Sequence, residues 1–326
     1  MNQGSLEQRS LLQALLSDGR PLLIFTGLSL VMSGCFALFL AATGHFLPHD
    51  IQFLGMTTEQ LCAINGCRVV HFMLHDRVAF GGSLIAIGAL YMWTAEFPLR
   101  QGEVWSWWLF VITGCAGFGS FLTYLGYGYL DMWHGIATLF LIPCFIVGLI
   151  RSFAYLTGPR SIRTLFIPGV VVPWRSLFGL GRALLLATSL GMVLGGATIM
   201  TVGMTSVFVP QDLEFMGMTA SDLHAINPRL VPLIAHDRAG FGGGIGTCGL
   251  AVLFCVWCGR PSKSLWQVLC FSGVVGFATA IGVHPVVGYN NLFHLAPAIV
   301  GAVMFIIGLG LCYGPMCKRQ LMKGRC

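Results

Sequence analysis

Two copies of the tripeptide His-Asp-Arg, at residues 75–77 and 236–238, carry side chains that could do chemistry in this sequence. Each copy is followed by a histidine at nearly the same distance, His134 in the first case and His294 in the second. Neutral imidazoles bind iron, copper and zinc, and one imidazole from each of two facing helices can supply both axial ligands of a haem. The histidines therefore predict a haem or metal site, and they are His75, His134, His236 and His294.

The composition shows which kind of element must position these side chains. The chain has 326 residues, of which 56% are hydrophobic and only 9% are charged, whereas soluble domains have roughly 25% charged residues. So few charges cannot cover a water-facing surface of this size. The chain is therefore expected to be an integral membrane protein in contact with the lipid bilayer, which excludes cytosolic enzymes and nucleic-acid binders.

The second half of the sequence repeats the first. PHDIQFLGMT at 48–57 returns as PQDLEFMGMT at 210–219, and HDRVAFGG at 75–82 returns as HDRAGFGG at 236–243. A third pair of blocks keeps the same order, with GYLDMWH ending at His134 and GYNNLFH ending at His294. The blocks indicate a duplicated unit of about 160 residues, and repeats of this kind decide the architecture.

Each unit has four apolar stretches long enough to cross a bilayer, which takes roughly 20 helical residues. We therefore predict an all-α membrane protein with eight transmembrane helices, arranged as two tandem four-helix bundles. The expected spans lie near 21–44, 73–95, 105–126, 132–153, 180–206, 234–257, 265–286 and 292–313. The paired glycines at 81–82 and 242–243 would let something flat approach these helices.

Lysine and arginine gather in the segments that fall on one side of this topology, which places both termini in the cytoplasm. The expected parts are a cytoplasmic N-terminal segment (1–20), a first four-helix repeat (21–155), a cytoplasmic linker (156–179), a second four-helix repeat (180–314) and a basic cytoplasmic tail (315–326). A bacterial inner membrane is the expected location, with the net charge of +6 explained by this topology.

The repeated polar blocks then fall on the outer side, where we expect each His-Asp-Arg triplet to open its helix. Asp131 and His134 are three residues apart and can share one helix face. Because the first half is richer in titratable groups, Asp76 and Asp131 are the candidate catalytic carboxylates. Arg77 and Arg238 are candidate cofactor contacts, since ionisable residues at a membrane boundary are functional by default. Asp76 holding Arg77 or a lipid contact is the structural alternative.

This layout resembles the haem A synthase family, which has tandem four-helix membrane bundles with haem-ligating histidines on the second and fourth helices of each half. The resemblance implies that His75 pairs with His134, and His236 with His294, around a haem. The family also has a cysteine pair in its first outer loop, which would correspond to Cys62 and Cys67, a possible disulfide. Its catalytic glutamate corresponds to Phe72, so a haem-binding bundle is implied rather than that family's hydroxylation.

Three functions remain open on the sequence. The first is a membrane haem protein that transfers electrons or oxidises a lipophilic substrate, with a quinol or a redox protein as partner. The second is a membrane protein with a non-haem iron, copper or zinc ion, bound by the histidines together with Asp76 and Asp131. The third is a non-catalytic subunit or scaffold of a larger membrane complex.

Overall fold

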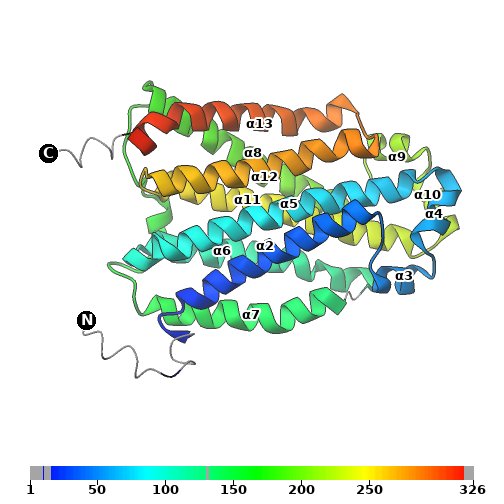
Figure 1. Cartoon of the computed structure of the whole chain (residues 1–326), viewed down its shortest axis with the longest axis horizontal. Coiled ribbons are helices and arrows are strands. Elements are labelled where there is room, and N and C mark those ends of the chain that lie inside the picture. Colours follow the sequence, from blue (N-terminus) through cyan, green and yellow to red (C-terminus); the bar gives the residue numbers. More distant parts are fainter. Residues whose placement is uncertain (1–9, 11–15, 130–131, 319–326) are drawn as a thin grey trace.

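The computed structural model describes residues 10, 16–129 and 132–318, and these residues form helices with no strand among them. The long helices run side by side along one axis (Figure 1). They are α2 (Arg20–Thr43), α5 (Arg68–Glu96), α6 (Val104–Phe121), α7 (Met132–Phe153), α8 (Leu177–Met204), α11 (Leu230–Cys258), α12 (Lys263–Val287) and α13 (Leu292–Tyr313).

Four short helices gather at one end of the bundle, which we name the capped end (Figure 1). They are α3 (Pro48–Leu54), α4 (Thr58–Asn65), α9 (Pro210–Met216) and α10 (Ala220–Ile226). The start of α2 and the end of α13 are both at the opposite end of the bundle. Short 3₁₀ segments at Leu99–Gln101, Leu122–Tyr127 and Ile162–Phe166 link the long helices, and a π-helical turn at Gly314–Lys318 follows α13.

Seven helices among the described residues are long and apolar enough to cross a membrane. They correspond to seven of the eight expected spans. By length and composition, the chain is therefore a multi-pass membrane protein, as the sequence predicts. The expected span at 105–126 is instead a shorter apolar helix, Val104–Ser120, followed by the 3₁₀ segment Leu122–Tyr127.

The two helices that carry the His-Asp-Arg triplets form the centre of the bundle. The most apolar stretch of α5 is 78% buried and that of α11 is 61% buried, against 17–33% for the other five candidate spans. Because lipid is as apolar as these side chains, an outer helix can expose its leucines and phenylalanines without cost. The centre is where polar side chains can find partners.

Helices of the two sequence repeats interleave, and this differs from the expected pair of separate bundles. α5 packs against α2 of its own repeat and also against α12, while α11 packs against α8 and also against α6. The paired glycines explain the arrangement: Gly81 faces α2 at Gly34, whereas Gly82 faces α12 at Thr279. The glycine pair thus admits two neighbouring helices rather than a flat ligand.

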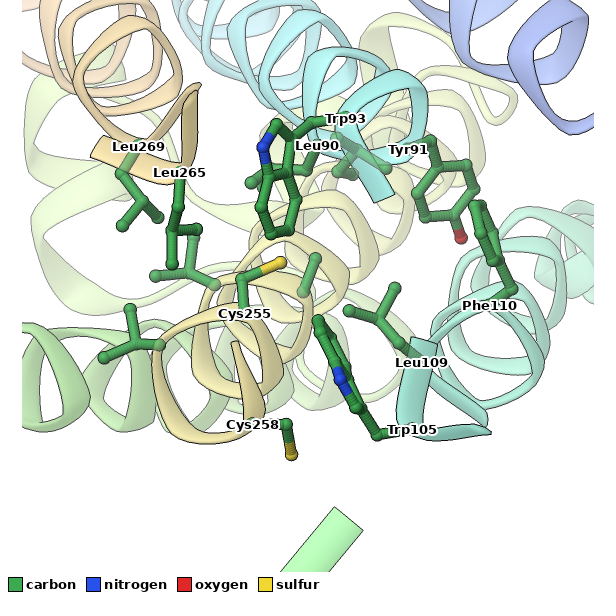
Figure 2. Close-up of a cluster of buried hydrophobic side chains, with 14 of the residues drawn as sticks. Leu90, Tyr91, Trp93, Trp105, Leu109, Phe110, Cys255, Cys258, Leu265 and Leu269 are labelled. Carbon is green, nitrogen blue, oxygen red and sulfur yellow. The ribbon is translucent and has the colours of Figure 1, made fainter. Parts of the chain in front are cut away.

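The end of the bundle opposite the capped end has a packed apolar core. Figure 2 shows Leu90 and Trp93 of α5 and Trp105 and Leu109 of α6 around the end of α11. Cys255 and Cys258 of α11 are both buried members of this cluster. This core holds α5 and α11 together, so their other ends meet in register at the capped end.

The close packing of α8 on α11 gives a first testable prediction. A Cβ on Gly196 would lie 2.4 Å from the backbone nitrogen of Gly246 and 2.5 Å from the carbonyl oxygen of Gly242. Backbone cannot rotate away, so Gly196→Ala should destabilise the protein by about 1–3 kcal/mol. The matched control is Gly191→Ala on the same helix, where nothing lies within 4 Å. Thermal unfolding in detergent would show equal midpoints for the two variants if this packing were not tight.

Candidate metal centre

The His-Asp-Arg triplets lie two turns inside their helices, and this corrects the expectation that they open them. α5 begins at Arg68 and α11 at Leu230, because each helix starts directly after the short helices of the capped end. Asp76 is 1% exposed and so is a buried group rather than a helix cap. A carboxylate buried this deeply needs a charged or hydrogen-bonding partner.

Three histidines meet on one side of α5. His75 Nε2 lies 3.1 Å from Nε2 of His284 on α12, and the ring of His294 on α13 is 5.6 Å from that of His75, between centroids. One ligand atom from each of the three lies within 4.8 Å of the others. His75 and His284 are buried and His294 is half-buried. Nitrogens bound to one ion at about 2.0–2.1 Å lie no more than about 4.2 Å apart, so the 3.1 Å between His75 and His284 fits this spacing, and the 4.8 Å limit for the whole group exceeds it.

The second nitrogen of each ring is held by an outer partner that fixes its proton. His75 Nδ1 lies 2.9 Å from the Asp76 carboxylate, and His284 Nδ1 lies 2.6 Å from the backbone carbonyl oxygen of Tyr289. His294 Nδ1 lies 3.3 Å from the Tyr289 hydroxyl, whose own proton goes to Asp212 at 2.8 Å. Carboxylate and carbonyl oxygens only accept, so these Nδ1 atoms donate. This pattern is the usual outer shell of metal-binding histidines.

It follows that the Nε2 atoms of the neutral rings carry lone pairs. The two that lie 3.1 Å apart, on His75 and His284, would then face each other with no proton between them. Two acceptors at hydrogen-bonding distance repel unless a cation lies between or beside them. The cluster is therefore arranged for a positive charge, either a metal ion or a shared proton.

Each triplet arginine joins the two repeats beside this cluster. Arg77 donates to Asp237 at 2.8 Å and to Asp50 of α3 at 2.7 Å. Arg238 is placed in the same way, donating to Asp212 of α9 and lying 3.7 Å from Asp76. Each arginine thus pairs with one carboxylate from its own repeat and one from the other.

Two tyrosines complete this symmetric network. Tyr129 donates its hydroxyl to Asp50, and Tyr289 donates to Asp212. Each tyrosine ring also lies against the triplet histidine of the other repeat, Tyr129 at 5.1 Å from His236 and Tyr289 at 5.6 Å from His75, between centroids. The site is therefore built across the repeats, not within one.

His294, the expected partner of His236, lies beside His75 and His284. His236 Nδ1 lies 3.1 Å from Asp237, as His75 does from Asp76. The side chain of His134, and Asp131 altogether, lie outside the described residues, so their expected roles stay predictions. Position 124, which corresponds to His284 in the repeat, is a tyrosine. A three-histidine group is therefore found on one side among the described residues.

Haem does not fit between α5 and α13 as these residues are packed. His284 closes the space against His75, and the Tyr289 ring stacks on His294 with centroids 4.6 Å apart. Tyr289 is 1% exposed, and Phe72, whose ring stacks on that of His75, is fully buried. Three imidazoles in contact suit a single ion rather than a macrocycle between two of them.

A cavity of about 440 Å³ lies on the opposite side of the central helices, between α2, α5, α6, α7 and α11. Its polar end is at the capped end, where it is lined by Asp50, Arg77, His236 and Asp237. The rest of its wall is mainly apolar and aromatic, with a few hydroxyl side chains such as Ser33 and Thr113. This volume is in the range of sites for small organic ligands.

Cys62 and Cys67 are joined in a disulfide between α4 and the start of α5. Asn65, the last residue of α4, lies within the segment that the disulfide closes, and its side-chain amide donates to the backbone carbonyl oxygen of Met216 at 3.0 Å. The disulfide thus lies where the short helices of the two repeats contact each other over the histidine cluster.

Sequence reasoning missed five residues of this site as partners: Asp50, Tyr129, Asp212, His284 and Tyr289. The signal for the two aspartates was present, since both fall at one position of the repeated blocks PHDIQ and PQDLE. The tyrosines likewise repeat in GY at 128–129 and 288–289. His284 gives no such signal, because the other repeat has a tyrosine there.

Comparison with models of protein families, with curated proteins and with solved structures finds no match to this chain.

A second prediction concerns Tyr289, which lies between α12 and α13, outside the membrane-spanning segments. Burial and the adjacent Asp212 carboxylate raise the pKa of Tyr289 well above its ordinary value of 10.0. The folded state therefore holds this proton more tightly than the unfolded chain does, and its contribution to stability is present below about pH 10 and lost above it. The unfolding temperature of Tyr289→Phe should fall less steeply than that of the wild type above this pH. Parallel pH profiles would contradict the assignment.

Proposed function

We propose that the chain is a multi-pass membrane metalloprotein that binds one iron, copper or zinc ion through His75, His284 and His294. The observation that supports this most is the pair of Nε2 lone pairs 3.1 Å apart, with a third imidazole beside them and every Nδ1 engaged elsewhere. Three neutral imidazoles suit these ions and do not suit magnesium or calcium, which prefer oxygen ligands.

Within this proposal the chain's own residues hold the ligands in place. Asp76 fixes the tautomer of His75, and Tyr289 fixes those of both His284 and His294. Iron or copper would supply one-electron chemistry at this position, for electron transfer or for oxidation of a lipophilic substrate. A quinol or a redox protein would be the electron-exchanging partner. The alternative is that the chain is a non-catalytic subunit or scaffold of a larger membrane complex and that the ion has a structural role.

The topology that goes with this proposal has eight crossings, with α6 as the eighth. Its support is that α2 begins and α13 ends at the same end of the bundle. Both termini would be cytoplasmic, the capped end would face the outside of a bacterial inner membrane, and the disulfide there suits an oxidising compartment.

Metal analysis of the detergent-purified full chain tests the function. After growth with added iron, copper and zinc, the protein should retain about one equivalent of one of them through gel filtration. Stripping with a chelator and adding the metal back should raise the unfolding temperature, because an ion that binds the folded state stabilises it. A chain that takes up no stoichiometric metal would contradict the proposal, and a proton shared by His75 and His284 would then explain their contact.

Haem is the second candidate, and the cavity bordered by His236 and by α7 is the observation that favours it. α7 carries His134, so one imidazole from α11 and one from α7 would be the axial pair. A reduced-minus-oxidised spectrum with pyridine haemochrome quantitation decides between the two candidates. Low-spin haem bands would support haem, and a colourless chain with bound metal would support the three-histidine ion.

A further inference from the structure

The cavity beside α5 has the features of a ligand site that is separate from the histidine cluster. His75 and Arg77 are two residues apart on one helix, so their side chains leave it about 200° apart and at nearly the same depth. The cluster therefore lies on one side of α5, and the cavity, which Arg77 lines, lies on the other.

The cavity is open toward lipid between α2 and α7. Among its lining residues, Phe25 and Phe36 of α2 are 50% and 45% exposed, and Ile136 and Phe140 of α7 are 42% and 65% exposed. In a membrane-spanning chain these side chains would contact acyl chains. A molecule dissolved in the bilayer could therefore enter sideways without crossing water.

The charged residues at the polar end of the cavity restrict which head group such a molecule can have. Arg77 is already paired with both Asp50 and Asp237, so this end has one carboxylate more than it has arginines. A phosphate or carboxylate head would meet that surplus negative charge in a poorly solvated place. An uncharged head that donates hydrogen bonds would instead be stabilised by the two carboxylates.

The shape of the wall restricts the ligand further. Gly240 lines the polar end of the cavity, and a Cβ there would have no atom within 4 Å, so a flat ring can approach the α11 backbone at this point. The outer part is lined by phenylalanines and aliphatic side chains, which suit a single apolar tail. We propose that this cavity binds a bilayer-soluble hydroquinone, with its hydroxyls toward Asp50 and Asp237 and its tail leaving between α2 and α7.

Titration calorimetry with decyl-substituted hydroquinone on the full chain in nanodiscs tests this binding. Ala137→Trp fills the cavity from α7 and should weaken binding by about tenfold or more, since the ligand would have to displace a bulky ring. Leu139→Trp is the matched control, because Leu139 is 68% exposed on the same helix and does not line the cavity. Ser33→Phe on α2 is a second obstruction if Ala137→Trp does not fold.

The outcomes separate this inference from the metal proposal. We expect binding to the wild type and to Leu139→Trp, weaker binding to both obstructed variants, and unchanged metal content in all four proteins. Decyl phosphate should not bind, and farnesol should bind at least about tenfold more weakly than the hydroquinone. Equal binding of either compound, equal binding by the obstructed variants, or haem in the purified chain would overturn the proposal.

Discussion

Replacing Arg238 with methionine is expected to destabilise the folded protein by about 3–5 kcal/mol, the cost of breaking a buried ion pair from one side. Arg238 is 3% exposed, and its guanidinium donates to Asp212, which is fully buried, and approaches Asp76, which is 1% exposed. Methionine has a similar length and fills much of the same space. The loss would therefore come from leaving two carboxylates without their cation.

Unfolding of the detergent-solubilised chain by SDS measures this effect. Arg229→Met is the matched control, because Arg229 is exposed and its guanidinium donates to the Phe53 carbonyl oxygen and not to a carboxylate. Adding Asp212→Asn to Arg238→Met should recover part of the stability, since it removes one of the stranded charges. If Arg238→Met is as stable as Arg229→Met, the arginine network does not hold the two repeats together.

The network also explains how far the sequence leads toward the site. The repeated His-Asp-Arg blocks identify three groups per repeat that need partners, because a polar triplet in an apolar helix cannot be left unpaired. The partners themselves depend on which helices touch. Gly82 and Gly243 decide this by admitting Thr279 of α12 and Ser120 of α6, and nothing in their local sequence says which helix will be admitted.

Equal spacing favours pairing the histidines within each repeat, and His294 departs from this expectation because it lies beside His75 of the other repeat. The second and fourth long helices of a repeat carry their histidines at a similar depth in the membrane. At the histidines, however, α5 meets α12 and α13 of the other repeat. Depth along a helix follows from residue counting, whereas the neighbour across the bundle follows from side-chain packing. The repeat therefore predicts the level of the site in the membrane and not its ligand set.

Replacing His284 with tyrosine is expected to abolish stoichiometric metal binding while leaving the fold intact. Tyrosine is the residue that the first repeat has at this position, Tyr124, so the substitution makes the two repeats alike there. It removes the nitrogen that lies 3.1 Å from His75 and leaves two imidazoles, His75 and His294. Losing one of three ligands should lower metal affinity by more than the 10–100-fold that loss of an outer partner costs.

Metal titration of the purified variant, followed by chelator competition, measures the loss. His224→Tyr is the matched control, because His224 is exposed on α10 and outside the cluster. Thermal unfolding without metal should be similar for His284→Tyr and the wild type, since the repulsion between the two facing lone pairs is relieved at the same time as a hydrogen bond to the Tyr289 carbonyl is lost. Full metal occupancy in His284→Tyr would move the binding site away from this cluster. Loss of metal in His284→Tyr but not in His224→Tyr would show that the site depends on His284, which only one repeat has, and not on the His-Asp-Arg motif alone, which both repeats have.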